Sequence, residues 1–170
     1  MYLVEFENQE IKKFDIALAL FTNKSDELAD NLIWQFVDNS QVDRAIVLSF
    51  LDELDDFSHE TGDIILTADN SLDELDNFLS SKEVDRAVFL VNDFKDGRTF
   101  SLIRYLRNKG FDKEIYVLGN YGLDQANYYL KSGATGFFVK DEQLDTLLKT
   151  LEDLKSGHFG NSVKALPMFR

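Results

Sequence analysis

The segment AVFLVNDFKDGRTFSLIRYLRNKG, residues 87–110, contains the unit from which the fold is inferred. Its first five residues are all apolar, which is typical of a strand that is covered on both faces. A polar loop follows, and apolar residues then recur at helical spacing from Arg98 to Lys109. Asp96 is placed to cap this helix, and Gly110 is placed to end it in a left-handed conformation. The segment therefore predicts a strand, a loop and a helix in succession.

The same unit recurs along the chain, because short apolar runs alternate with amphipathic stretches. Ser71 and Glu74 form a capping box before one helix, and Asp124 and Gly133 are placed to begin and end another. The predicted strands are 16–21, 45–50, 64–68, 87–91, 115–118 and 136–139. This alternation predicts an α/β fold, with a mainly parallel sheet of about six strands and helices on both faces, flavodoxin-like or receiver-like.

One domain is predicted over residues 1–170, because no linker is visible and the only proline is Pro167. Residues 1–14 are expected to form a short edge strand or hairpin, and residues 158–170 an extended tail. The last helix has an apolar stripe at helical spacing, which predicts core packing. The stripe consists of Leu144, Leu147, Leu148, Leu151 and Leu154.

The chain is strongly acidic, with 31 acidic against 18 basic side chains and a net charge of −13. Nucleic acids and anionic membranes need a basic surface, so neither is expected as a partner. A basic protein partner is compatible with this charge, and solubility alone also explains it.

Several classes of site are excluded by composition. The chain has no cysteine, which removes disulfides, thiolate metal sites, iron–sulfur clusters and a cysteine nucleophile. The two histidines, His59 and His158, belong to no metal-binding motif, and no dinucleotide fingerprint, phosphate loop or serine-hydrolase elbow occurs. We therefore predict no cofactor and no metal. The first residues lack a signal peptide, and no apolar run reaches the roughly 20 residues of a membrane span, so a cytoplasmic location is expected.

The candidate site lies where strands end and helices begin, because ligands of parallel sheets gather there and helix N-termini favour anions. Gly97, Ser101 and Arg104 share one helix face, with Arg98 next to Ser101. The candidate ligands of a small oxyanion are Asp96, Gly97, Arg98, Ser101, Arg104, Gly119, Asp124, Gln125 and Lys140. The structural alternative is that Asp96 only caps the helix and Arg98 pairs with Asp93, Asp124 or another carboxylate.

Two families resemble parts of the chain. Residues 132–140, SGATGFFVK, resemble the receiver segment that leads to the conserved lysine of response regulators. The first predicted strand, however, lacks the acidic pair that holds the receiver's metal ion. This resemblance therefore implies at most a receiver that cannot be phosphorylated.

The second resemblance covers residues 62–170. The motif DGRTFS at 96–101, the segment KEIYVLG at 113–119 and the pair Asp124-Gln125 resemble the bacterial family catalogued as domain of unknown function 934. That family is often labelled an oxidoreductase of sulfite reduction. Thr99, Tyr116 and Ser132 stand where the family usually has glycine, arginine and cysteine, so no role of those three residues is carried over.

The resemblance implies an accessory or binding protein of assimilatory sulfite or sulfate reduction. It would bind a sulfur oxyanion or a partner such as a sulfite-reducing enzyme. An enzyme that acts on a sulfur oxyanion is one alternative, and a receiver-like signalling domain is another. Trp34 and several tyrosines could also form the interface of a homo-oligomer. This alternative is left open, since core packing explains these residues equally well.

Overall fold

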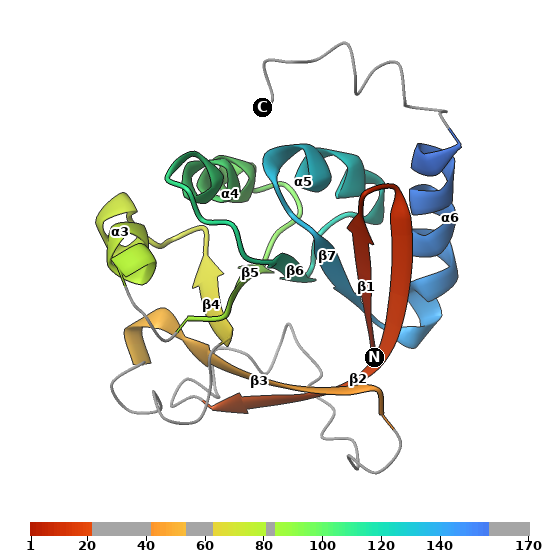
Figure 1. Ribbon diagram of the computed structural model, residues 1–170, viewed down its shortest axis with the longest axis horizontal. Helices are drawn as coiled ribbons and strands as arrows, with labels where there is room; N and C mark the ends of the chain where they lie inside the picture. Colours follow the sequence, from red (N-terminus) through yellow and green to blue (C-terminus); the bar gives the residue numbers. More distant parts are fainter. Residues whose placement is uncertain (22–41, 54–62, 81–83, 157–170) are drawn as a thin grey trace.

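Strands form where the sequence has short apolar runs, and helices form where apolar residues recur every three or four positions. A computed structural model describes residues 1–21, 42–53, 63–80 and 84–156 (Figure 1). The strands are β1 (Tyr2–Glu7), β2 (Glu10–Phe21), β3 (Arg44–Phe50), β4 (Asp63–Thr67), β5 (Arg86–Val91), β6 (Ile115–Gly119) and β7 (Gly136–Val139). The helices are α3 (Leu72–Ser80), α4 (Arg98–Asn108), α5 (Ala126–Ser132) and α6 (Leu144–Lys155), with short 3-10 turns η2 (Leu51–Glu53), η3 (Leu123–Gln125) and η4 (Asp141–Gln143).

The predicted elements of the described residues are present at close to their predicted bounds. The Ser71 hydroxyl accepts the N–H of Glu74 at 3.1 Å before α3. Gly110 and Gly133 end α4 and α5 with φ of 94° and 126°. The predicted tail at 158–170, like Trp34 and both histidines, lies outside the described residues.

The strands pair in the order in which they occur in the chain, and the sheet closes into a barrel. Neighbours from β2 to β7 are parallel, whereas β1 is antiparallel to both β2 and β7. The predicted flavodoxin-like or receiver-like order is therefore wrong, and the fold gives the receiver resemblance no support. The crossovers through α3, α4 and α5 each step to the next strand, so these helices fall on one face of the sheet, and the sheet's twist curls it around the other face.

The opening segment is a hairpin, as predicted, but it has no free edge. Asn8 and Gln9 both have positive φ, 54° and 63°, as a two-residue type I′ turn requires. The other side of β1 pairs with β7, where Leu3 lies opposite Phe138. The placement of residues 1–14 at a sheet edge is wrong, because β1 is the strand that closes the barrel.

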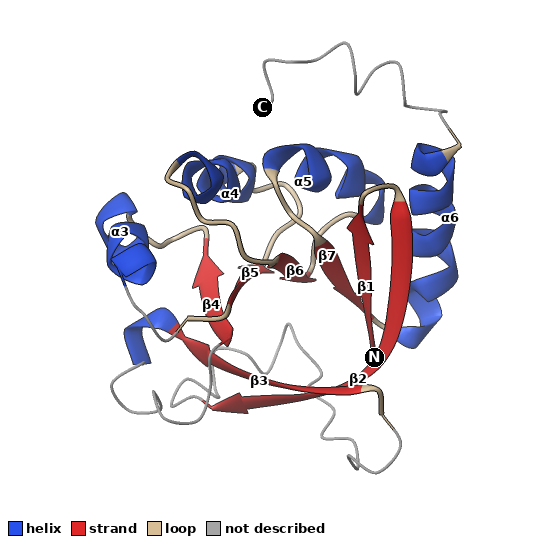
Figure 2. Ribbon diagram, viewed as in Figure 1, coloured by secondary structure: helices blue, strands red, loops and turns tan. Residues whose placement is uncertain are grey.

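The sheet is buried on both faces, but in two different ways. The outer face packs against α3, α4, α5 and α6, which lie to the left of, above and to the right of the barrel in Figure 2. The inner face forms a second core, whose buried members among the described residues are all strand side chains, such as Leu48, Val88 and Leu118. Helices on both faces were predicted, yet all helices of the described residues lie outside the barrel. Apolar strands look the same in sequence whether a helix or the opposite barrel wall covers them.

Polar side chains join strands across the barrel near the amino ends of β3 to β6. The Glu5 carboxylate accepts hydrogen bonds from Arg44 Nη1 at 3.2 Å and from the Tyr116 hydroxyl at 2.5 Å. These three residues lie on β1, β3 and β6, which are not neighbours in the sheet, so the bonds cross the interior. Beside them, Arg86 makes a bidentate pair with Asp63, with N···O distances of 2.8 and 2.9 Å. This network fixes the inner core at one end of the barrel.

None of the helices in the described ranges is both long enough and apolar enough to cross a bilayer.

Candidate functional site

The loop between β5 and α4 is built from side-chain turns. The Asp93 carboxylate accepts the N–H of Lys95 at 2.9 Å, and the Asp96 carboxylate accepts the N–H of Arg98, the first residue of α4, at 3.1 Å. Gly97, which stands between them, has a helical φ of −77°, and a Cβ there would meet nothing. The N-cap residue of α4 is thus Gly97 and not Asp96 as predicted, although the Asp96 carboxylate does accept the first N–H of the helix. Nothing near Gly97 sterically requires a glycine at this position.

Arg98 is held in ion pairs at this loop. Its Nη2 lies 2.7 Å from Asp96 Oδ2 and 3.1 Å from Asp69 Oδ1. Hydrogen bonds from Arg98 lower the pKa of the Asp96 carboxyl below its ordinary value. Arg98 thus pairs with carboxylates, as the structural alternative proposed, although with Asp96 and Asp69 rather than Asp93 or Asp124. An anion would have to compete with two carboxylates for this guanidinium.

Gly119 and Gln125 tie the loop after β6 to the loop after β5. Gly119 has φ of 104°, and a Cβ there would lie 2.5 Å from the Val91 carbonyl oxygen. Gln125 accepts the N–H of Gly122 at 3.3 Å and donates to the Phe94 carbonyl at 3.2 Å. The contacts described for these two residues are structural.

Asp124 and Lys140 lie apart from these contacts. Asp124 is exposed within η3, which begins after Gly122, and α5 begins only after Gln125. The prediction that Asp124 caps α5 is therefore wrong. Lys140 is half-buried and connects β7 to η4.

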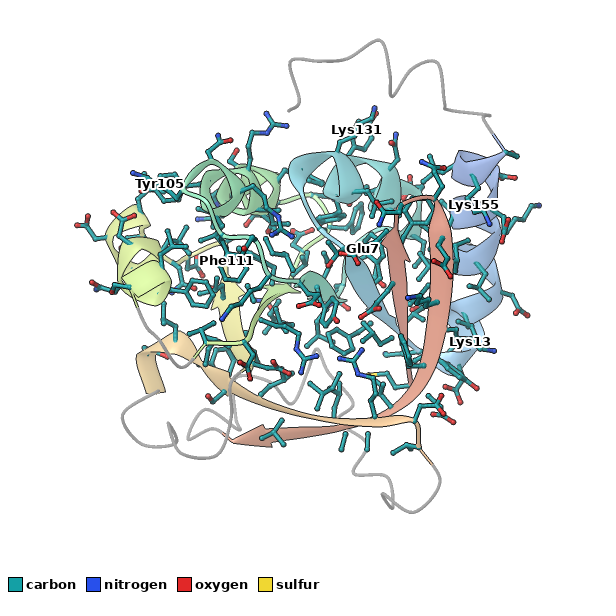
Figure 3. The ribbon with its side chains drawn as sticks, in the orientation of Figure 1. Glu7, Lys13, Tyr105, Phe111, Lys131 and Lys155 are labelled. Carbon is teal, nitrogen blue, oxygen red and sulfur yellow. The ribbon has the colours of Figure 1, made fainter. Side chains whose placement is uncertain are left out.

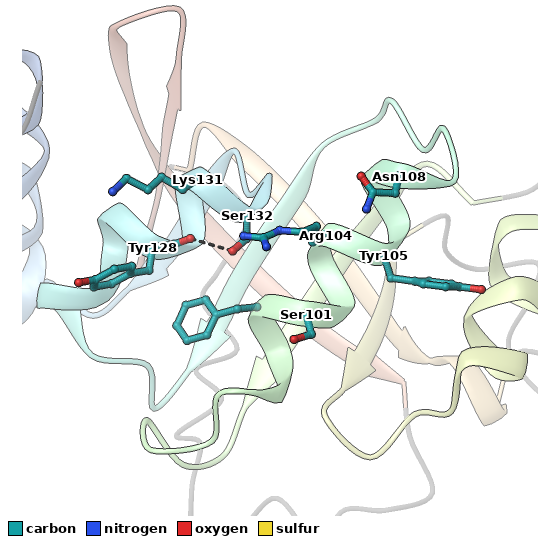
Figure 4. Close-up of a pocket in the computed structure, with 8 residues that line it drawn as sticks. Ser101, Arg104, Tyr105, Asn108, Tyr128, Lys131 and Ser132 are labelled. Carbon is teal, nitrogen blue, oxygen red and sulfur yellow. Dashed lines mark hydrogen bonds between the residues drawn. The ribbon is translucent and has the colours of Figure 1, made fainter. Parts of the chain in front are cut away.

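A pocket of about 440 Å³ lies between α4 and α5 (Figure 4). It contains two of the nine predicted ligands, Ser101 and Arg104. Arg104 extends from α4 towards Ser132 on α5, and Lys131 lies on the outer side of α5, away from the barrel (Figures 3 and 4). The lining consists of Phe100, Ser101, Arg104, Tyr105, Asn108, Tyr128, Lys131 and Ser132.

The pocket is basic within an acidic protein. It has two cationic side chains, and none of the described residues that line it is acidic. The Ser101 and Ser132 hydroxyls and the Asn108 amide add neutral hydrogen-bonding groups. The Ser132 hydroxyl donates to the Tyr128 carbonyl at 2.9 Å, which leaves its oxygen as an acceptor. The arrangement is suited to binding an anion, and the described lining contains no nucleophile beside a general base.

Sequence reasoning missed the α5 side of this pocket. Ser101, Arg104 and Asn108 share a face of α4, while Tyr128, Lys131 and Ser132 share a face of α5. Each set is visible as helical spacing. Their meeting depends on the order of β5, β6 and β7, which places the two helices side by side.

A second cavity, of about 290 Å³, lies at the carboxyl ends of β3, β4 and β5. This is the edge where the sequence predicted an anion site. Asp52, Asp69 and Glu74 line it beside Asn70 and Asn92, so its carboxylates disfavour an anion. Within the described part of the chain, no group of three or more acidic or histidine side chains is arranged to hold a metal ion.

Comparison with known proteins gives one match. No curated protein and no solved structure matches the chain. The family described as "Bacterial protein of unknown function (DUF934)" matches residues 63–169, which is more than half of the 170 residues and includes α4, α5 and the pocket between them. The chain therefore belongs to the DUF934 family of bacterial proteins.

Proposed function

We propose that this protein is a binding protein that holds a small sulfur oxyanion in the pocket between α4 and α5, as an accessory to sulfite or sulfate reduction. The observation that carries the proposal is that Arg104 and Lys131 both line this pocket, and that none of its described lining residues is acidic, in a chain of net charge −13. Cationic side chains together with neutral donors, here the Ser101 hydroxyl and the Asn108 amide, are the usual ligands of tetrahedral oxyanions.

The link to sulfur rests on the label often given to the family. Enzymatic action on the oxyanion is the weaker alternative, since Arg98, the arginine expected at the strand ends, is engaged by Asp96 and Asp69. The acidic remainder of the surface is suited to a basic partner protein, such as an enzyme that supplies or consumes the anion.

The test is a thermal-shift and calorimetric titration with sulfite, sulfate and phosphate. A ligand that binds only the folded chain stabilises it by about 2.7 kcal/mol at a concentration 100 times its Kd. We expect at least one sulfur oxyanion to raise the Tm of the wild type, with a reduced shift for Arg104→Gln and for Lys131→Gln.

The matched controls are Lys149→Gln, an exposed lysine on α6, and Arg98→Ala at the ion-paired loop. Both remove one positive charge outside the pocket and should keep the wild-type response. If no oxyanion changes the Tm, or if the controls lose the response as fully as the pocket variants do, the proposed site is wrong.

A further inference from the structure

We infer that the pocket between α4 and α5 takes an oxyanion joined to a planar aromatic group, the chemistry of a nucleoside monophosphate or of its mixed anhydride with sulfate. This inference rests on the proposed function, because it assigns the anion to the same cationic pair and adds a second half to the ligand.

The size of the pocket is the first argument. Its volume is about 440 Å³. Pockets of about 300–1,000 Å³ hold whole organic ligands, whereas a water molecule takes roughly 30 Å³ of liquid. A free sulfate or sulfite, with four or five heavy atoms, would leave most of this pocket to solvent. A ligand that fills it needs a further group several times larger than the anion.

The aromatic wall is the second argument. Tyr128 is 52% exposed, so one of the largest exposed apolar side chains of the described residues is at the pocket. Phe100 fixes its position through an edge contact, with ring centroids 6.4 Å apart. Phe100 is itself packed on the buried Tyr129 ring at 4.4 Å. A supported but exposed aromatic face is what a base needs for stacking, and such stacking is sequence-tolerant because every base has a π-face.

The distribution of polar groups is the third argument. Along α4, Ser101, Arg104 and Asn108 share one face over seven residues, or roughly 10 Å of helix at 1.5 Å per residue. Lys131 Nζ lies 5.6 Å from the centre of the Tyr128 ring, so a cation and the stacking surface are adjacent on α5. The Asn108 amide supplies both a donor and an acceptor, which suits the edge of a base. One ligand can therefore contact the cations with its anion and Tyr128 with its ring.

The experiment compares AMP with its two halves, adenosine and inorganic phosphate, by isothermal titration calorimetry on the whole chain, with sulfate and adenylyl sulfate beside them. We expect AMP or adenylyl sulfate to bind at least tenfold more tightly than phosphate, sulfate or adenosine. Tyr128→Leu should lose about tenfold of that affinity, whereas Tyr128→Phe should keep it. Arg104→Gln should reduce binding of the nucleotide and of the free ion alike.

Tyr128 is exposed, so both of its variants are expected to fold, and an unchanged far-UV spectrum and Tm check this. If sulfate binds as tightly as AMP and Tyr128→Leu changes neither, the inference is overturned while the proposed oxyanion site stands. If adenosine binds as tightly as AMP, the inference is overturned, and the proposed function is decided by the sulfate titration alone. If no anion binds, both the inference and the proposed function fail.

Discussion

The guanidinium of Arg98 forms ion pairs with the carboxylates of Asp96 and Asp69. The ion pair with Asp96 makes the pKa of that carboxyl depend on Arg98. The pKa of Asp96 is lowered, first by hydrogen bonds from the Arg98 side chain and then by its backbone N–H. A depressed folded-state pKa stabilises the fold above the ordinary aspartate value of about 4, and this contribution is lost as the pH falls through the depressed value.

Arg98→Ala should therefore raise the pKa of Asp96 towards its ordinary value, because the largest cause of the shift is removed. Carboxyl-carbon NMR titration measures this directly. The difference in unfolding free energy between wild type and variant should be largest near neutral pH and shrink in acid. Lys95→Ala, which removes a neighbouring charge on the same loop, should leave the titration of Asp96 nearly unchanged. An unshifted Asp96 in Arg98→Ala would contradict the pairing.

Tyr121 is buried, and its hydroxyl donates to the Phe138 carbonyl of β7 at 2.6 Å. Burial raises the pKa of this hydroxyl, so it remains a donor at all ordinary pH values. Tyr121→Phe removes only the oxygen and should lower the free energy of unfolding by about 1 kcal/mol. Urea denaturation measures the change, with the exposed Tyr128→Phe as the control that should cost almost nothing. An equal effect in both variants would argue against a specific hydrogen bond.

At the scale of elements, Arg107 joins three segments of backbone. From α4 it donates through Nε and Nη2 to the Gly133 carbonyl at the end of α5, at 2.9 and 2.8 Å. Its Nη1 donates to the carbonyls of Phe111 and Lys113, which precede β6, at 2.8 and 2.6 Å. A Cβ on Gly133 would lie 2.5 Å from the Arg107 Cγ, so the turn after α5 and this side chain fit each other closely.

Arg107→Lys should destabilise the fold by about 1.5–3 kcal/mol, since a lysine keeps the charge but cannot reach several carbonyls with a planar fork. Urea denaturation gives the magnitude. Hydrogen exchange should show the loss of protection concentrated around α5 and the start of β6. Lys109→Gln, an exposed change in the same part of the chain, is the control. A uniform loss of protection across the chain would contradict a local role for Arg107.

The helices and strands could be predicted from the sequence, whereas their arrangement in space could not. Apolar runs such as 87–91 and stripes such as Leu144–Leu147–Leu151 identify strands and helices, because these patterns are local. The strand order is not local, since a run buried by a helix and one buried by the opposite barrel wall are equally apolar. The residues of the candidate site also fall into a part that could be predicted and a part that could not. Ser101 and Arg104 were found from spacing on one helix, but Lys131 and Tyr128 meet them only through the packing of α5 beside α4.

At the scale of the whole molecule, one short strand decides between an open sheet and a closed one. A hairpin of β1 and β2 could form at the edge of any sheet, so the pairing that identifies the barrel is β1 with β7. β2 pairs with β1 through residues 10–15 and with β3 through residues 16–21. β7 has β6 on one side and β1 on the other, so closure removes the free edge that β7 would have in an open sheet and protects it from pairing with other chains. The absence of cysteine from the sequence makes this pairing simple to test.

Tyr2 and Val139 are cross-strand partners in the antiparallel pair of β1 and β7. The double variant Tyr2→Cys/Val139→Cys should form a disulfide under mild oxidation, detected by thiol titration and by mass. In the chain-entropy view, a bridge that closes so long a loop should stabilise the fold by about 4–5 kcal/mol. Tyr2→Cys/Phe138→Cys is the matched control, because a shift of one residue turns the second side chain to the opposite face. An open sheet with β1 at a free edge would leave both double variants reduced, while disulfide formation in the first alone requires the closed barrel.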